Sequence, residues 1–294
     1  MAIKKGIYAA SMSILNKDLS LDIDSTISHS EKLLQEGCDG IAIFGSTGQS
    51  QLISSEEKKK LIKKLGNRKS NENFIIGTGE NALNQNIEIM KYSIENGINR
   101  FLIMPPAYYK YGDDEVYIFF EKIIQSVPSA EIILYNFEKL SGYKFSEEII
   151  KKLVKNFPKS ILGVKDSSYN LYKKLKIPNF LIFPGSETKL LEGLELGCSG
   201  IISAVCNVTA PIAHKVYDAY LNKKKQTFNK KLCDVRKVFD EYNLISGLHS
   251  FMSLEDDKYK RVIPPLSLLT EKNQKELISK LKNLDFFPEK SKAA

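Results

Sequence analysis

Residues that build disulfides and metal sites are scarce in this sequence. Its 294 residues include four cysteines and three histidines, and no two cysteines have C-x-x-C spacing. Metal sites and disulfide frameworks need such residues in clusters, so we expect free thiols and no metal centre. The histidines lie in helix-like segments, which also disfavours a Ser-His-Asp arrangement. These residues are Cys38, Cys198, Cys206, Cys233, His29, His214 and His249.

Long apolar runs are absent as well. No stretch of 18 apolar residues occurs, and the first residues, MAIKKGIYAASMSI, lack the apolar core and cleavage site of a signal peptide. The formal charge is +8, but the lysines lie mostly in mixed-charge runs such as SSEEKKKLIKKLG, which are typical of the exposed faces of amphipathic helices. We therefore expect a cytoplasmic protein that binds neither membranes nor nucleic acids.

Short apolar strands that alternate with helical segments make up most of the chain. Helical segments such as STISHSEKLLQEG and SEEIIKKLVKNF open at Ser, and several close at Gly. Near-continuous apolar strands are typical of parallel sheets covered on both faces, and a count of eight favours an α/β fold of the (β/α)8 TIM barrel type. The predicted strands are GIYAASMSI, GIAIFGS, FIIGTG, RFLIMPP, EIILYNF, ILGVK, FLIFPGS and GIISAV.

A doubly wound sheet is the alternative fold. It is disfavoured because the first strand is not followed by a glycine-rich dinucleotide turn, and GSTGQS lacks the G-x-G-x-x-G pattern. From about residue 208 the pattern becomes helical only. We therefore predict a catalytic barrel over residues 1–224 and a C-terminal helical region over residues 225–294.

Polar residues occur selectively at the carboxyl ends of the predicted strands, where TIM barrels carry their chemistry. The buried strand ILGVK ends in Lys165, and Tyr135 ends the preceding strand. A lone lysine at a strand end is usually solvated or salt-bridged; its convergence with other polar strand ends favours a chemical role. The remaining strand-end residues include Gly45, Ser46, Thr47, Tyr109, Ser167, Gly185, Ser186 and Glu187.

This residue set suits imine chemistry. A lysine attacks a ketone only in its neutral form, and burial at the mouth of an apolar barrel favours that form. Imine formation also needs a proton shuttle, which Ser46, Tyr135 and Tyr109 can form together. The amides and hydroxyls of GSTG, residues 45 to 48, suit a substrate carboxylate, although such a sequence alone is more often a turn.

Motifs along nearly the whole chain resemble the dihydrodipicolinate synthase and N-acetylneuraminate lyase family, which are pyruvate-dependent class I aldolases. The motif IAIFGSTGQSQLISSEEK resembles the family's G-T-T-G-E or G-S-T-G-E signature and the segment that follows it. ILYNF carries the Tyr-Asn pair, LGVKDSS the Schiff-base lysine, and GCSGIISAVCNV the eighth strand. Several motifs in the right order make the resemblance specific.

The resemblance implies roles for individual residues. Lys165 forms a covalent imine with pyruvate, so no separate cofactor is expected, and Tyr135 is the proton shuttle. Ser46 and Thr47 bind the pyruvate carboxylate. The family donates the tyrosine matching Tyr109 across a dimer interface, which implies a homodimer or a dimer of dimers, a homotetramer. Two further positions line the pyruvate pocket, Gly185 and Ile202.

Departures from the family pattern bear on the second substrate. Lysine-pathway synthases carry an arginine, which binds the aldehyde's carboxylate, where this chain has Leu140, and Gln49 replaces the signature glutamate. Sialic-acid lyases share the Leu-Ser-Gly of this segment, but their Asp-Glu pair is replaced here by residues 186 to 188, and a serine by Ala204. Neutral or singly charged groups suit the hydroxyls of a polyhydroxylated aldehyde: Ser167, Ser186, Glu187 and Thr188.

Three functions follow as hypotheses. The first is a lyase that cleaves a 2-keto-3-deoxy sugar acid, or an N-acetylneuraminate-like substrate, to pyruvate and an aldehyde, or runs the reverse condensation. The second is a 4-hydroxy-tetrahydrodipicolinate synthase of lysine biosynthesis, which shares the imine half-reaction. The third is a non-catalytic protein that binds pyruvate or a sugar acid. Retention of Lys165, Tyr135, Tyr109 and both signature hydroxyls disfavours the third.

Overall fold

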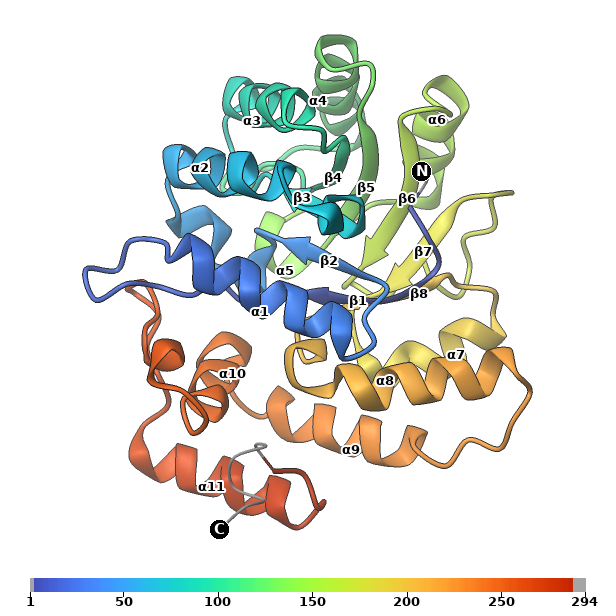
Figure 1. The fold of residues 1–294 in the computed structure, drawn as a ribbon. Coiled ribbons are helices and arrows are strands. Elements are labelled where there is room, and N and C mark those ends of the chain that lie inside the picture. The colour runs from blue at the N-terminus through green and yellow to red at the C-terminus, as the bar shows by residue number, and fades with distance from the viewer. Residues whose placement is uncertain (1–2, 288–294) are drawn as a thin grey trace.

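The computed structural model describes residues 3–287. Within them, eight parallel strands form one sheet in the order β7-β6-β5-β4-β3-β2-β1-β8. β1 pairs with β8, and the amide of Ser199 donates to the carbonyl of Ile182 at 2.8 Å between β7 and β8, so the sheet curves into a nearly closed barrel (Figure 1). The strands are β1 (Gly6–Ala10), β2 (Gly40–Ile43), β3 (Phe74–Gly77), β4 (Arg100–Ile103), β5 (Glu131–Asn136), β6 (Ile161–Asp166), β7 (Leu181–Pro184) and β8 (Gly200–Ser203).

Helices connect the strands and cover the outside of the barrel. Ser54 and Ser146 cap two helices as expected, and the Ser54 side chain accepts from the amide of Glu57 in a capping box. The first helix begins earlier than the predicted Ser25, because the Asp22 side chain caps it and accepts from the amide of Ser25. The helices between strands are α1 (Ile23–Gln35), α2 (Ser55–Gly66), α3 (Leu83–Glu95), α4 (Asp113–Ser126), the short α5 (Glu138–Ser141), α6 (Glu147–Asn156) and α7 (Leu190–Glu195), with short 3-10 turns η1 (Ser46–Gly48), η2 (Ser50–Leu52), η3 (Lys69–Asn73) and η4 (Glu187–Lys189).

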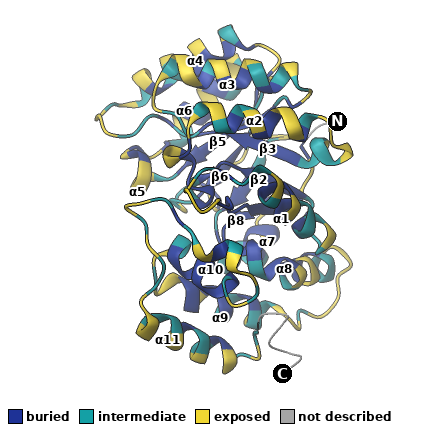
Figure 2. Ribbon diagram, turned by 60° about the vertical axis from the view of Figure 1, so that its left-hand side comes forward, coloured by how far each residue is buried: buried dark blue, intermediate teal, exposed yellow. Residues whose placement is uncertain are grey.

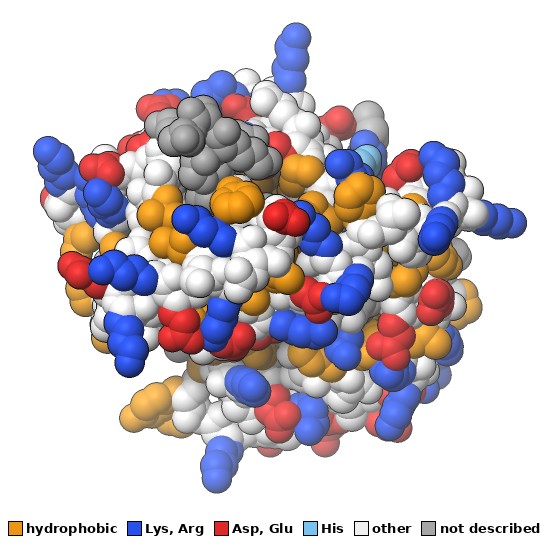
Figure 3. All heavy atoms as spheres, turned by 90° about the horizontal axis from the view of Figure 1, so that it is seen from below, with side chains coloured by type: hydrophobic (Ala, Val, Ile, Leu, Met, Phe, Trp, Pro, Cys, Tyr) orange, Lys and Arg blue, Asp and Glu red, His pale blue; other side chains and the backbone are white. Residues whose placement is uncertain are grey.

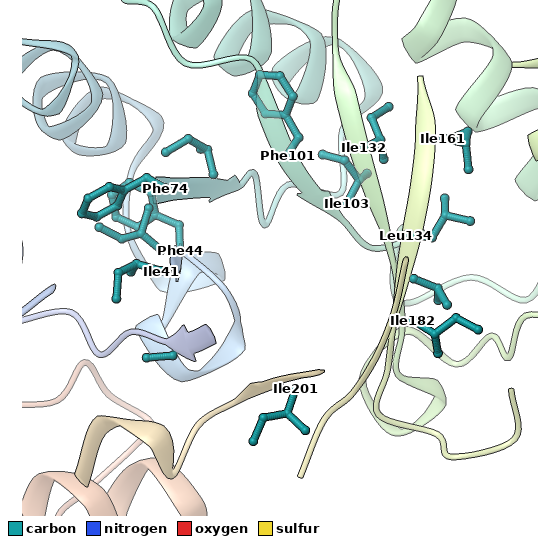
Figure 4. Packing of buried hydrophobic residues seen from close by; sticks show 14 of the residues in the cluster. Ile41, Phe44, Phe74, Phe101, Ile103, Ile132, Leu134, Ile161, Ile182 and Ile201 are labelled. Carbon is teal, nitrogen blue, oxygen red and sulfur yellow. The ribbon is translucent and has the colours of Figure 1, made fainter. Parts of the chain in front are cut away.

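Two apolar layers follow from the alternation of side chains along each strand. Outward residues such as Ile41, Phe101 and Ile132 pack against the helices (Figure 4). Inward residues, among them Ala42 and Ile133, form a separate cluster inside the barrel. The barrel interior is therefore a packed core, and the predicted (β/α)8 fold is confirmed.

The C-terminal helices form their own cluster below the barrel in Figure 1. α8 (Cys206–Leu221) packs on β1 and completes the outer layer, whereas α9 (Asn229–Asp240), α10 (Leu244–Met252), η5 (Asp257–Lys260) and α11 (Glu271–Lys282) follow it. Met12, Ile14 and Val205, from the carboxyl ends of β1 and β8, belong to the same cluster as these helices. The region thus packs against the edge of the barrel where the strands end. The predicted boundary at residues 224 and 225 falls in the connection between α8 and α9.

Surface properties agree with the amphipathic pattern. The strands are buried and the outer faces of the helices exposed (Figure 2). Basic and acidic side chains are interspersed on the face drawn in Figure 3.

All four cysteines are free, as expected. Across residues 3–287, no helix combines the length and apolar character needed to cross a membrane.

Candidate active site

A cavity of about 800 Å³ lies at the carboxyl ends of the strands. Lys165 lines it from the end of β6 and Tyr135 from the end of β5, and the connection after β2 contributes two hydroxyls. Part of its wall comes from α9 and the start of α10, so the C-terminal region completes the site. The lining residues predicted from sequence are Ser46, Thr47, Tyr135, Lys165, Ser167 and Gly185.

Lys165 and Tyr135 are side by side because β5 and β6 pair with these two residues in register. The Nζ atom of Lys165 lies 4.1 Å from the centroid of the Tyr135 ring. Both side chains are almost fully buried, at 3% and 4% exposure. Tyr135 also belongs to the apolar cluster inside the barrel, together with Ile202 and Phe183. The amine therefore sits above an apolar core with a phenol beside it.

The Tyr135 hydroxyl lies 3.0 Å from the Oγ atom of Ser46, so the two groups share a hydrogen bond. Ser46 opens the turn η1, which is held from below: Ser13 Oγ donates to the carbonyl of Gly48 at 2.7 Å, and Gln49 Oε1 accepts from the amide of Ile263 at 2.7 Å. Gln49, at the glutamate position of the family signature, thus anchors the turn to the C-terminal region. This turn presents both signature hydroxyls to the cavity.

Asp166, for which no role was predicted, fixes these strand ends together with Asn136 of the predicted Tyr-Asn pair. Asp166 is fully buried and accepts from Asn136 Nδ2 at 2.8 Å and from the amides of Leu171 and Tyr172 at 2.9 and 3.0 Å. Because Asn136 follows Tyr135 and Asp166 follows Lys165, this bond locks the two strand ends together. Buried groups hold their geometry when every polar atom is satisfied. An acidic residue directly after a buried strand was the available signal.

Gly185 has a steric reason to be glycine. A Cβ atom there would lie 2.3 Å from Ser167 Oγ, closer than real Cβ contacts allow. Any larger residue would therefore require Ser167 to shift. Gly185 lines the cavity, and its part in binding pyruvate stays a prediction.

The sequence did not predict a role for Arg236 in the site, because this residue lies in α9, whose pattern is that of any amphipathic helix. Its Nη1 donates to Glu187 Oε2 at 2.8 Å and to Ser203 Oγ at 3.0 Å, and its Nε donates to Asp240 Oδ1 at 2.9 Å. Burial acts to lower the pKa of Arg236, but Glu187 and Asp240 outweigh it and raise the pKa. The guanidinium therefore stays charged in the cavity wall.

Other predicted residues lie outside this cavity. The Glu187 carboxylate is fully buried against Arg236 and Ser203, so it faces a protein cation instead of open space. Ser186 caps η4, and Ile202 lies in the barrel interior. Gly45 and Leu140 line a second, apolar cavity of about 320 Å³ that shares Ser46 and Tyr135 with the first.

Tyr109 is not part of its own chain's cavity. It is 74% exposed, its neighbour Tyr108 is 90% exposed, and the two rings meet edge to face at 5.1 Å. They lie in the connection between β4 and α4. Two adjacent tyrosines at this exposure place an unusually large aromatic surface in solvent.

Comparisons with known proteins agree with this geometry. Residues 4–284 match the model of the dihydrodipicolinate synthetase family. A 4-hydroxy-tetrahydrodipicolinate synthase of Methanothrix thermoacetophila is 25% identical, over 95% of this chain and 98% of its own. A 2-dehydro-3-deoxy-D-gluconate/2-dehydro-3-deoxy-phosphogluconate aldolase of Picrophilus torridus is 29% identical, over 76% of this chain and 85% of its own.

The fold has close structural counterparts. The prophage protein YagE of E. coli K12, solved in complex with pyruvate, superposes with a TM-score of 0.87 at 23% identity, covering 97% of this chain and 100% of that one. The relatives are named as a synthase and an aldolase, and the family match extends over nearly the whole chain, including all eight strands of the barrel. This chain therefore belongs to the dihydrodipicolinate synthetase family.

Proposed function

We propose that the protein is a Schiff-base aldolase that cleaves a 2-keto-3-deoxy sugar acid to pyruvate and a polyhydroxylated aldehyde, or runs the reverse condensation. The observation that carries this proposal is the pair formed by Lys165 and Tyr135, 4.1 Å from Nζ to ring centroid. A buried amine with a phenol beside it has what imine catalysis needs, a nucleophile and a proton carrier.

The reaction follows from these groups. Lys165 Nζ adds to the C2 keto carbon, and the Tyr135 phenol gives its proton to the departing hydroxyl, so that loss of water leaves a protonated imine and a phenolate at Tyr135. Tyr135 accepts the proton of the C4 hydroxyl; the C3–C4 bond breaks, the aldehyde leaves, and the electron pair enters the enamine. Protonation at C3 and hydrolysis then release pyruvate and restore the amine. Ser46, hydrogen-bonded to Tyr135, continues the proton relay, and Thr47 with Ser46 holds the carboxylate.

The aldehyde half of the substrate is inferred from Leu140. Its side chain lines the apolar cavity next to Tyr135, where lysine-pathway synthases are expected to hold a carboxylate-binding arginine. The resemblance to a sugar-acid aldolase supports the same choice. A missing charge-assisted hydrogen bond removes roughly 1.5 to 3 kcal/mol of binding, or about one to two powers of ten in kcat/KM.

A second candidate is the 4-hydroxy-tetrahydrodipicolinate synthase reaction. It is favoured by the relative of that name, which is similar over 95% of this chain. The two candidate reactions share the formation of the imine with pyruvate and differ in the aldehyde that is released or condensed. We expect a higher kcat/KM for sugar-acid cleavage than for condensation of pyruvate with aspartate semialdehyde. Efficient condensation without detectable sugar-acid cleavage would reverse this ranking.

Borohydride trapping tests the imine. Reduction in the presence of pyruvate should add a reduced pyruvyl group to the peptide that carries Lys165, and Lys165→Arg should abolish the labelling. Lys139, an exposed lysine that also lines the cavity, provides the matched control, and Lys139→Arg should label normally. Full inactivation with an unmodified Lys165 peptide would disprove the assignment and, with it, the aldolase proposal.

We also propose that Tyr109 acts from a partner subunit, so the active unit is a homodimer or a dimer of dimers. Its 74% exposure within one chain and its adjacency to Tyr108, which is 90% exposed, support burial against a second copy. In a partner's cavity it would extend the relay of Ser46 and Tyr135.

A further inference from the structure

The guanidinium of Arg236 has one nitrogen without a partner. Within residues 3–287, the hydrogen bonds of this side chain all come from Nη1 and Nε. Nε donates to Asp240, and Nη1 donates to Glu187, to Ser203 and, at 3.4 Å, to the carbonyl of Gly185. Nη2 makes none of them. The Arg236 side chain is only 8% exposed, and it lines the same cavity as Lys165. Nη2 is therefore free to donate a hydrogen bond to an acceptor in the cavity that Arg236 lines.

We propose that Arg236 and Asp240 bind hydroxyl groups on the aldehyde half of the substrate and select an unphosphorylated, polyhydroxylated tail over a phosphorylated one. The proposal rests on the proposed function, since it names the substrate class of the same site. Nη2 would donate a hydrogen bond to a hydroxyl oxygen, and the Asp240 carboxylate would accept a hydrogen bond from that hydroxyl or from a neighbouring one. A hydroxyl can satisfy both groups because it donates and accepts.

The charges around Arg236 determine whether the site prefers a neutral or an anionic aldehyde half of the substrate. Glu187 is fully buried and Asp240 is 46% exposed at the side chain, so two carboxylates face one guanidinium and the cluster has a net charge of −1. A phosphate would bring about two more negative charges next to Asp240. Repulsion in a partly buried site then opposes the attraction of Arg236. An arginine without a second carboxylate would prefer the phosphate instead.

Apart from Lys165, which forms the imine, the other charged residues that line the cavity lie in α5. Glu138 pairs with Lys144 at 3.2 Å, and Lys139 is exposed at the rim. Tyr169 also lines the wall and is a neutral donor, since burial raises the pKa of its hydroxyl. Lys139 is thus the cation that a phosphate would use if the Arg236 cluster did not decide selectivity.

Removal of one carboxylate tests the proposal. We would measure kcat/KM for a six-carbon 2-keto-3-deoxy sugar acid and for its 6-phosphate. The wild type should prefer the unphosphorylated substrate by at least tenfold, and Asp240→Asn should reduce this ratio by about tenfold, because the repulsion on the phosphate is lost. Asp234→Asn is the matched control on the same helix, since Asp234 pairs with Lys230 and Lys237 outside the cavity. It should leave the ratio unchanged.

Arg236→Lys tests the donor without leaving Glu187 unpaired. A lysine keeps the positive charge but loses the planar fork, so kcat/KM for the sugar acid should fall about 10- to 100-fold, mainly through KM. Borohydride trapping of pyruvate in each protein separates the two proposals: a wild type that forms no imine disproves the aldolase. If imine trapping is intact, a selectivity ratio that is equal in wild type and Asp240→Asn, or that follows Lys139→Gln instead, overturns the role of the Arg236 cluster.

Discussion

At the level of single residues, the proposed chemistry depends on two side chains that adjacent strands hold in contact. Lys165 and Tyr135 are cross-strand partners, and the bond between Asn136 and Asp166 fixes their strands at the next position. The phenol is nearly fully buried and bonded to Ser46, so its position is determined by protein contacts. A proton carrier held in this way contributes most when it is already oriented.

Tyr135→Phe should therefore lower kcat by 10²- to 10⁴-fold, the usual contribution of a general acid-base group, while the binding of pyruvate is largely kept. Tyr117→Phe is the matched control, because the Tyr117 hydroxyl accepts from Asn156 on the outer helices. It should have wild-type activity. A Tyr135→Phe protein within about twofold of the wild type would remove Tyr135 from the mechanism.

At the level of helices, Tyr259 in η5 joins the C-terminal region to the barrel. Its hydroxyl lies 2.9 Å from Nδ1 of His29 on α1, and its carbonyl 2.9 Å from Nδ1 of His249 on α10. Burial lowers the pKa of both histidines to about 4. His249 also approaches Gln49, whose side chain anchors the turn that carries Ser46. His249 therefore belongs to the contacts around Gln49, which holds the turn that carries Ser46.

The free energy of unfolding should fall in acid, because burial makes both histidines harder to protonate in the folded chain. Between pH 6.5 and about 4 the unfolded chain protonates both histidines and the folded chain does not, so the unfolded state binds more protons and stability decreases as the pH falls. The expected slope is about 1.4 kcal/mol per pH unit for each histidine. Urea unfolding at several pH values measures it.

The exposed His214 supplies the control for this slope. A His214→Gln variant should keep the acid dependence of the wild type, whereas His249→Gln should lose about half of the histidine contribution. Equal slopes in His249→Gln and wild type would show that buried histidines do not govern acid stability here.

At the level of the whole molecule, the exposed tyrosines distinguish a site completed by one chain from a site shared by two. Lys165 and Tyr109 lie in the same chain, but Tyr109 is outside that chain's cavity. If a partner subunit provides Tyr109, two inactive variants can restore activity when they form a mixed dimer.

Lys165→Ala and Tyr109→Phe subunits, each impaired alone, should regain activity when unfolded together and refolded as a mixture. One site of a mixed dimer then combines an intact Lys165 with an intact Tyr109 from the other subunit. Mixing without subunit exchange is the control and should add only the separate activities. If Tyr109 acts within its own chain, the refolded mixture should show no gain.

The barrel and its lysine could be predicted from the sequence because local physics encodes them. Eight apolar runs separated by capped amphipathic helices leave few folds that bury both faces of a parallel sheet. Strand ends in such a fold converge, so the sequence alone predicts that Lys165, Tyr135 and Ser46 lie close together. Their contact also needed only the pairing of neighbouring strands.

Only the tertiary structure decided the surroundings of that group. Arg236 lies 49 positions after Glu187, on a helix whose pattern gives no sign that it reaches the cavity. Glu187, expected to meet the substrate, turns toward this arginine because a buried carboxylate needs a cation. Asp166 and Gln49 likewise act through distant partners. Local patterns determine elements and the ends where they meet, whereas long-range ion pairs depend on how helices pack, which no short stretch of sequence specifies.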